Sequence, residues 1–141
     1  MTDEADIELS GASDFKGDIR SGVIKMDLDG SSDIEGGVGA DVLEVVLSGA
    51  SEAKLIGKVV VLKIDLSGSS GIAEQVVDHH YALACEHCEG EMSGASDAYI
   101  HCDGNIKVSL SGSSKLHFTG EGNPAESTVS GGSEIIYDVL P

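Results

Sequence analysis

The sequence predicts an all-β fold, a right-handed single-stranded parallel β-helix (solenoid) of about seven coils with a 19-residue repeat. Three observations predict it: a motif that recurs along the chain, apolar positions that alternate with polar ones, and 19 glycines against only five aromatic residues. The 141 residues fit one domain, 1–141, and 40% of them are hydrophobic, enough to form a core.

The recurring motif is a short corner built around a central glycine, as in Ser-Gly-Ala-Ser. Successive central glycines are separated by 19, 19, 19, 26, 18 and 19 residues. They are Gly11, Gly30, Gly49, Gly68, Gly94, Gly112 and Gly131. One unit of this length cannot bury its apolar side alone, whereas stacked units form one continuous core. Parallel crossovers are almost always right-handed, which favours that sense over a left-handed hexapeptide helix.

Two columns of apolar residues appear when the copies are aligned on the glycine. Two residues before it stand Leu9, Leu28, Leu47, Leu66, Met92, Leu110 and Val129. Four residues after it stand Phe15, Ile34, Ala53, Ile72, Ala98, Leu116 and Ile135. The residues beside the first column are mostly polar, and this alternation indicates short strands with one buried face. We therefore expect both columns to form the core.

A serine follows each glycine by two positions in all seven copies. These residues are Ser13, Ser32, Ser51, Ser70, Ser96, Ser114 and Ser133. Small residues at such a place indicate a crowded corner, where hydroxyl groups bond one another or nearby backbone groups. We interpret the serines and the central glycines as a structural ladder, in preference to an ice-binding or ligand-binding hydroxyl array.

The interval of 26 residues contains seven extra residues, which the alignment places at 75–84 as an extruded loop. Histidine and cysteine gather there, and a Cys-x-x-Cys pair flanked by histidines is typical of zinc ligation. The candidate ligands are His79, His80, Cys85, His87 and Cys88, with His101 and Cys102 nearby. The alternatives are ordinary core and surface residues or a redox pair, and the cysteines leave the redox compartment undecided.

The repeat register bears on these cysteines. Cys88 occupies the column of Ile24, Leu43 and Ile106, which predicts a core position. Cys85 lies three residues earlier, and in a straight strand that spacing puts it on the opposite face. A metal bound by both cysteines would need a bend between them.

An acidic residue stands three positions after the glycine in most copies. Asp14, Asp33 and Glu52 follow one another in consecutive copies, so stacked coils would hold their carboxylates about 5 Å apart. Such a row could bind a divalent cation such as calcium. The alternative is a solvated face whose charges salt screens.

The charge balance limits the class of partner. A formal net charge of −17 repels phosphate backbones and anionic lipid headgroups, so we expect neither nucleic acid nor direct membrane insertion. The sequence has no apolar run of membrane-spanning length and no export signal at its start. Short corners and a single arginine, Arg20, argue against a polysaccharide lyase or hydrolase, the enzyme alternative.

Three stretches of the sequence resemble a known family: IELSGASDFKG, CEGEMSGASDAYI and FTGEGNPAESTVSGGSEI. They are similar to the putative auto-transporter adhesin head domain family, or GIN domain. The resemblance implies a bacterial β-helix outside the cell, at the cell surface or in the periplasm, and no established activity. We expect a non-enzymatic adhesin-like or structural module whose ligand is a glycan or another envelope component. The sequence does not specify which glycan or envelope component this is, nor the oligomeric state.

Overall fold

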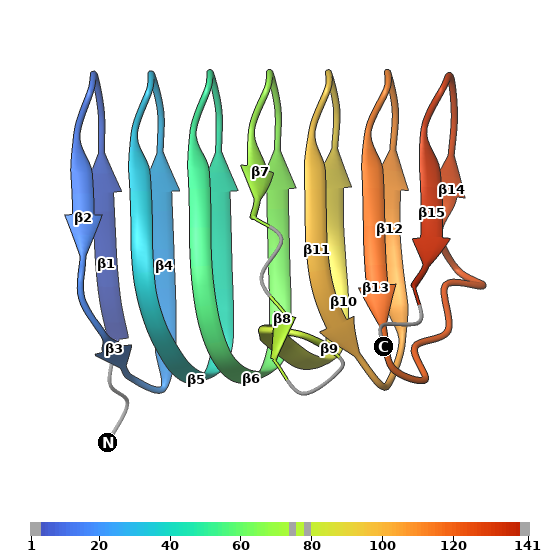
Figure 1. Cartoon of the computed structure of the whole chain (residues 1–141), viewed down its shortest axis with the longest axis horizontal. Coiled ribbons are helices and arrows are strands. Elements are labelled where there is room, and N and C mark those ends of the chain that lie inside the picture. The colour runs from blue at the N-terminus through green and yellow to red at the C-terminus, as the bar shows by residue number, and fades with distance from the viewer. Residues whose placement is uncertain (1–3, 74–75, 78–79, 139–141) are drawn as a thin grey trace.

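The computed structural model describes residues 4–73, 76–77 and 80–138 and shows a right-handed parallel β-solenoid of about seven coils (Figure 1). Thirteen of its fifteen strands form one continuous sheet that wraps around the core, and no helix occurs in the described part of the chain. The strands are β1 (Glu4–Leu9), β2 (Asp14–Lys16), β3 (Ile19–Arg20), β4 (Val23–Leu28), β5 (Asp33–Leu47), β6 (Glu52–Leu66), β7 (Gly71–Ile72), β8 (Val76–Val77), β9 (His80–Tyr81), β10 (Leu83–Met92), β11 (Asp97–Cys102), β12 (Ile106–Leu110), β13 (Lys115–Thr119), β14 (Thr128–Val129) and β15 (Glu134–Tyr137).

Each coil contributes to two walls. β1, β4, β12 and β14 belong to one wall, and β2, β7, β11, β13 and β15 belong to the other. The 15-residue strands β5 and β6 curve from one wall into the other, which joins the walls into a single sheet (Figure 1). All pairings in this sheet are parallel, because every coil repeats the same path one strand spacing further along the axis.

The members of each apolar column expected from the sequence pair with one another in the register of the sheet. Leu28 pairs with Leu9 on one side and Leu47 on the other, and Ile34 pairs with Phe15 and Ala53 in the same way. Column members in the middle of the stack are fully buried. Val129, in the last coil, is 46% exposed because an end coil has one neighbour instead of two. The predicted core is confirmed.

The corners stack as closely as the glycines allow. Gly49 has φ +70°, and a Cβ atom placed there would lie 2.4 Å from the carbonyl oxygen of Gly30 in the preceding coil. Only glycine tolerates both the left-handed backbone and this approach. The close contact between the two corners allows a backbone hydrogen bond, in which the amide of Ala50 donates to the Gly30 oxygen over 2.8 Å.

The serines of the corners are buried, apart from Ser13 in the first coil, which is partly buried. In the first six coils the hydroxyl donates to the carbonyl oxygen three residues earlier in the same coil, as Ser51 does to Ser48 over 2.9 Å. Ser133 differs, because its hydroxyl oxygen accepts a hydrogen bond from the amide of Ser114 in the preceding coil. The hydroxyls therefore close each corner onto itself more than they join one corner to the next.

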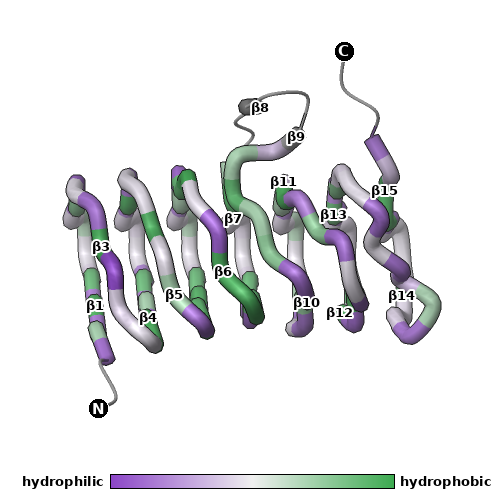
Figure 2. The backbone as a smooth tube through the Cα atoms, turned by 90° about the horizontal axis from the view of Figure 1, so that it is seen from below, coloured by the Kyte–Doolittle hydropathy of each residue, from purple (hydrophilic) through white to green (hydrophobic). Residues whose placement is uncertain are grey.

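In the 26-residue interval between Gly68 and Gly94, the chain leaves the stack of coils after β7. β8 and β9 pair with each other in a separate antiparallel ribbon, and Figure 2 shows β9 outside the tube of coils. Leu83 and Ala84, which we expected at the end of the loop, already belong to β10, where Leu83 pairs with Gly57. The described residues contain no helix of the length and apolar character needed to cross a membrane.

Candidate functional site

A groove of about 620 Å³ lies on the outer surface where the chain rejoins the coils after the ribbon. It is hollow because Ala84 in β10 stands between two larger residues in the neighbouring strands, Lys58 in β6 and His101 in β11. The methyl group of Ala84 reaches less far than either neighbour. The groove is lined by Ile56, Gly57, Lys58, Ala82, Ala84, Cys85, Glu86, His87, His101, Asp103 and Gly104.

Hydrogen-bond donors and acceptors both face this groove. Lys58 offers an ammonium group, and Glu86 and Asp103 offer carboxylates; all three residues are exposed. Nδ1 of His87 accepts a hydrogen bond of 3.3 Å from the amide of Asn105, so the neutral ring carries its proton on Nε2. The groove therefore combines donors and acceptors, beside the apolar side chain of Ile56, which is 49% exposed.

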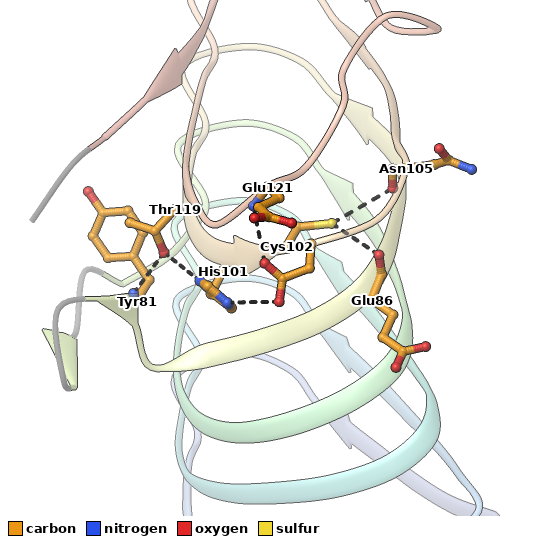
Figure 3. Close-up of polar contacts among 8 residues, drawn as sticks. Tyr81, Glu86, His101, Cys102, Asn105, Thr119 and Glu121 are labelled. Carbon is orange, nitrogen blue, oxygen red and sulfur yellow. Dashed lines mark hydrogen bonds and ion pairs between the residues drawn. The ribbon is translucent and has the colours of Figure 1, made fainter.

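A hydrogen-bond network ties the ribbon to one end of the groove (Figure 3). The amide of Tyr81 donates to Thr119 Oγ1 over 3.1 Å, and Thr119 Oγ1 lies 2.9 Å from Nδ1 of His101. Nε2 of His101 lies 3.2 Å from Asp103, whose other oxygen accepts from the amide of Glu121. That backbone hydrogen bond, together with His101, lowers the pKa of Asp103 below its ordinary value.

Thr119, His101 and Asp103 have the residue types of a nucleophilic relay. A substrate, however, cannot reach the Thr119 hydroxyl. Thr119 is 3% exposed, and its oxygen already accepts a hydrogen bond from the backbone of the ribbon. A nucleophile needs a hydroxyl that a substrate can reach. The network is therefore suited to holding β9 against β11 and β13.

Aromatic contacts add a second attachment of the ribbon. The ring of Tyr81 packs edge-on against Tyr99 at 5.4 Å, and Tyr99 stacks on His117 at 4.5 Å. Asp138 accepts a hydrogen bond from the Tyr81 hydroxyl and lies 3.0 Å from Nδ1 of His117. Segments far apart in sequence thus fix the ribbon, which is followed directly by the groove residues Ala82 and Ala84.

The structure corrects the expected orientation of one cysteine. Cys85 and Cys88 are both buried, because the coil bends between them at Glu86 and His87, which are exposed. Cys88 occupies the predicted core column, paired with Leu62 and Ile106. The expectation that Cys85 faces away from the core was wrong, because it assumed a straight strand.

The predicted zinc ligands are only partly described. His79 lies outside the described residues, and the side chain of His80 is not described either. Within the described part of the chain, no group of three or more histidine, cysteine and acidic side chains is arranged to hold a metal ion. Zinc binding by His79, His80, Cys85, His87 and Cys88 stays a prediction.

The acidic row is in register. Asp14 pairs with Asp33, and Asp33 pairs with Glu52, and all three are exposed. They border a second groove, of about 180 Å³, together with Lys16 and Lys54 from the same walls. Glu35 also lines this groove and lies 3.7 Å from Lys16, so the groove is acidic overall. Calcium binding by the row stays a prediction.

Sequence reasoning singled out His87 and Cys85 beside the groove but missed Lys58, Glu86 and Asp103. Lys58 and Ala84 belong to different repeats, and they become neighbours only because β10 rejoins the sheet at Leu83. The long interval was the one available signal, since it marked where the regular surface is interrupted.

The fold and this groove define a parallel β-solenoid whose outer surface is hollowed beside its longest coil. The chain belongs to the family described as putative auto-transporter adhesin, head GIN domain, whose model matches residues 1–122. Comparison with curated proteins and with solved structures finds no match.

Proposed function

We propose that the chain is a non-enzymatic binding module of the cell surface or envelope and that its groove holds a neutral glycan. The observation that carries the proposal is the composition of the groove, in which hydrogen-bond donors, acceptors and apolar surface meet within one volume of about 620 Å³. The family description, an adhesin head, supports the binding role and the surface location.

A sugar ring matches this composition. Its hydroxyl groups both donate and accept hydrogen bonds, while its C–H groups form small apolar faces. Glu86 and Asp103 supply acceptors, and Lys58 and Nε2 of His87 supply donors. Ile56 supplies apolar contact at the rim.

The charge of the protein selects among glycans. A formal net charge of −17 repels uronic acids and sialic acids, and it favours neutral or amino sugars. The carboxylates of Glu86 and Asp103 also favour neutral or amino sugars over acidic ones. Sugar hydroxyl and ammonium groups can donate hydrogen bonds to them, whereas a ligand carboxylate cannot.

A panel of immobilised neutral, amino and acidic glycans tests the proposal. We expect the purified chain to bind neutral or amino glycans, and Glu86→Gln and Lys58→Ala each to weaken binding about tenfold or more, since hydrogen bonds to charged groups contribute about 1.5 to 3 kcal/mol. Glu91→Gln on the same strand and Lys107→Ala are matched controls outside the groove, and we expect both to bind as the wild type does.

Failure to bind any glycan of the panel would contradict the proposal. Equal losses in the groove variants and in the controls would place binding elsewhere on the surface. Release of shorter products from a polysaccharide would instead favour the carbohydrate-active enzyme alternative.

A further inference from the structure

Two buried cysteines from consecutive coils face each other beside the groove. Cys85 in β10 and Cys102 in β11 are directly opposite in the register of this parallel pair. Both point into the core, with exposed fractions of 3% and 0%. The sequence drew attention to Cys85 and Cys88, but Cys88 pairs in register with Leu62 and Ile106, so no cysteine lies opposite it across a strand pair.

The register puts the first pair within disulfide range. Opposite residues of neighbouring strands lie about 4.8 Å apart, and disulfides join Cα atoms separated by about 4.4 to 6.8 Å. Cys102 Sγ donates to the carbonyl oxygen of Glu86, the residue that follows Cys85 in β10, over 3.4 Å. We propose that Cys85 and Cys102 are the site of an intramolecular disulfide that staples β10 to β11.

The reaction is a thiol–disulfide exchange with a low-molecular-weight disulfide such as oxidised glutathione. Cys85 is 3% exposed, so the reaction requires a local opening of β10 beside the groove. The Cys85 thiolate exposed in this way attacks one glutathione sulfur and releases the first glutathione thiolate. The Cys102 thiolate then attacks the Cys85 sulfur of the mixed disulfide and releases the second. The protein dithiol loses two electrons and two protons, and the oxidant leaves as two molecules of reduced glutathione.

The environment of the thiols determines the rate and the stability of the bond. Both thiols are buried, and burial disfavours the charged thiolate, so few thiolates exist at neutral pH. Exchange is therefore slow near pH 7 and accelerates about tenfold for each unit of pH. The same surroundings do not stabilise the reduced form as a thiolate, so the closed disulfide resists reduction. An oxidising compartment is where such bonds persist.

Peptide mapping of oxidised protein tests the pairing directly. Residues 64–107 hold all three cysteines and no lysine or arginine before Lys107, so trypsin leaves them in one peptide. Cleavage after glutamate then separates Cys85 in 75–86, Cys88 in 87–89 and Cys102 in 92–107. After incubation of the native protein with oxidised glutathione at pH 8.5, we expect 75–86 to be linked to 92–107, with Cys88 left as a free thiol.

Variants and stability give independent measurements. We expect Cys88→Ala to retain the linked peptide, and Cys85→Ala and Cys102→Ala to lose it. Oxidation of the wild type should raise Tm by about 5 °C or more, and a reductant should reverse this shift. The peptide map needs only the wild type, so it remains decisive where an alanine variant folds poorly.

Three results would overturn the proposal. One is a link between 75–86 and 87–89, which would identify the Cys-x-x-Cys pair as the redox site. Another is a chain that keeps three free thiols after prolonged oxidation at pH 8.5. The third is linkage between molecules alone.

Discussion

The hydroxyl of Ser51 donates a hydrogen bond of 2.9 Å to the carbonyl oxygen of Ser48, three residues earlier in the same corner. Ser51 is 1% exposed and lies in the middle of the stack. The bond satisfies the Ser48 carbonyl group within the turn. Each of the first six corners thus has its own internal hydrogen bond of this kind, repeated from coil to coil.

Replacement of Ser51 by valine should lower the free energy of unfolding by about 1 to 3 kcal/mol. The variant loses the hydrogen bond and places a larger side chain in a packed corner. Ser133→Val is the matched control, and we expect a smaller loss because the last coil has only one neighbour. Chemical denaturation of both variants measures the difference, and equal, negligible effects would contradict a buried ladder.

Replacement of Gly49 by alanine should be more damaging than the same change at Gly11. Both residues have φ near +70°, so each substitution incurs about 1 to 2 kcal/mol of backbone strain. At Gly49 the new Cβ atom also meets the Gly30 oxygen at 2.4 Å, whereas at Gly11 nothing lies within 4 Å. We expect Gly49→Ala to lose at least 2 kcal/mol more than Gly11→Ala in denaturant titrations. Similar losses would show that the corners do not stack closely.

Asp103 should contribute stability that acid removes. Its pKa is lowered in the folded protein, chiefly by the hydrogen bond from the amide of Glu121 and then by His101. A lowered folded pKa means that the contribution is complete above the ordinary carboxyl pKa and is lost as pH falls through the folded value. We expect Asp103→Asn to lower Tm by about 2 °C at pH 7, a small shift because the side chain is 55% exposed, and the difference from wild type to shrink as pH falls below the ordinary carboxyl pKa.

The exposed Asp41→Asn is the control for this measurement, and we expect its difference from wild type not to follow the same pH course. A Tm difference for Asp103→Asn that stays constant from pH 7 to pH 3 would contradict the role of the charge.

Calcium binding by the acidic row predicts a specific effect of the ion. If Asp14, Asp33 and Glu52 share a cation, millimolar calcium should raise Tm more than sodium chloride of the same ionic strength, and Asp33→Asn should remove the excess. Equal shifts in the two salts would show that screening alone acts on the row. Thermal melts of wild type and variant in the two salts decide between these interpretations.

The repeat allowed much of the fold to be predicted. Leu28, Leu47 and Leu66 stand at one spacing in sequence, and a solenoid converts that spacing into direct pairing between coils. The site was harder to predict. The relation between Cys85 and Cys88 was inferred from a straight strand, and the bend at Glu86 and His87 reversed it.

By itself the sequence determined the period, the glycine corners, the buried columns and the place of the interruption. Each of these follows from one repeated unit, because every coil meets the next at the same positions. Tertiary structure alone decided that Tyr81 bonds Thr119, 38 residues away, that Ala84 opens a groove beside Lys58, and that Cys102 faces Cys85. The extra residues break the period there, so these contacts depend on how the chain leaves the stack and rejoins it, which no repeat encodes.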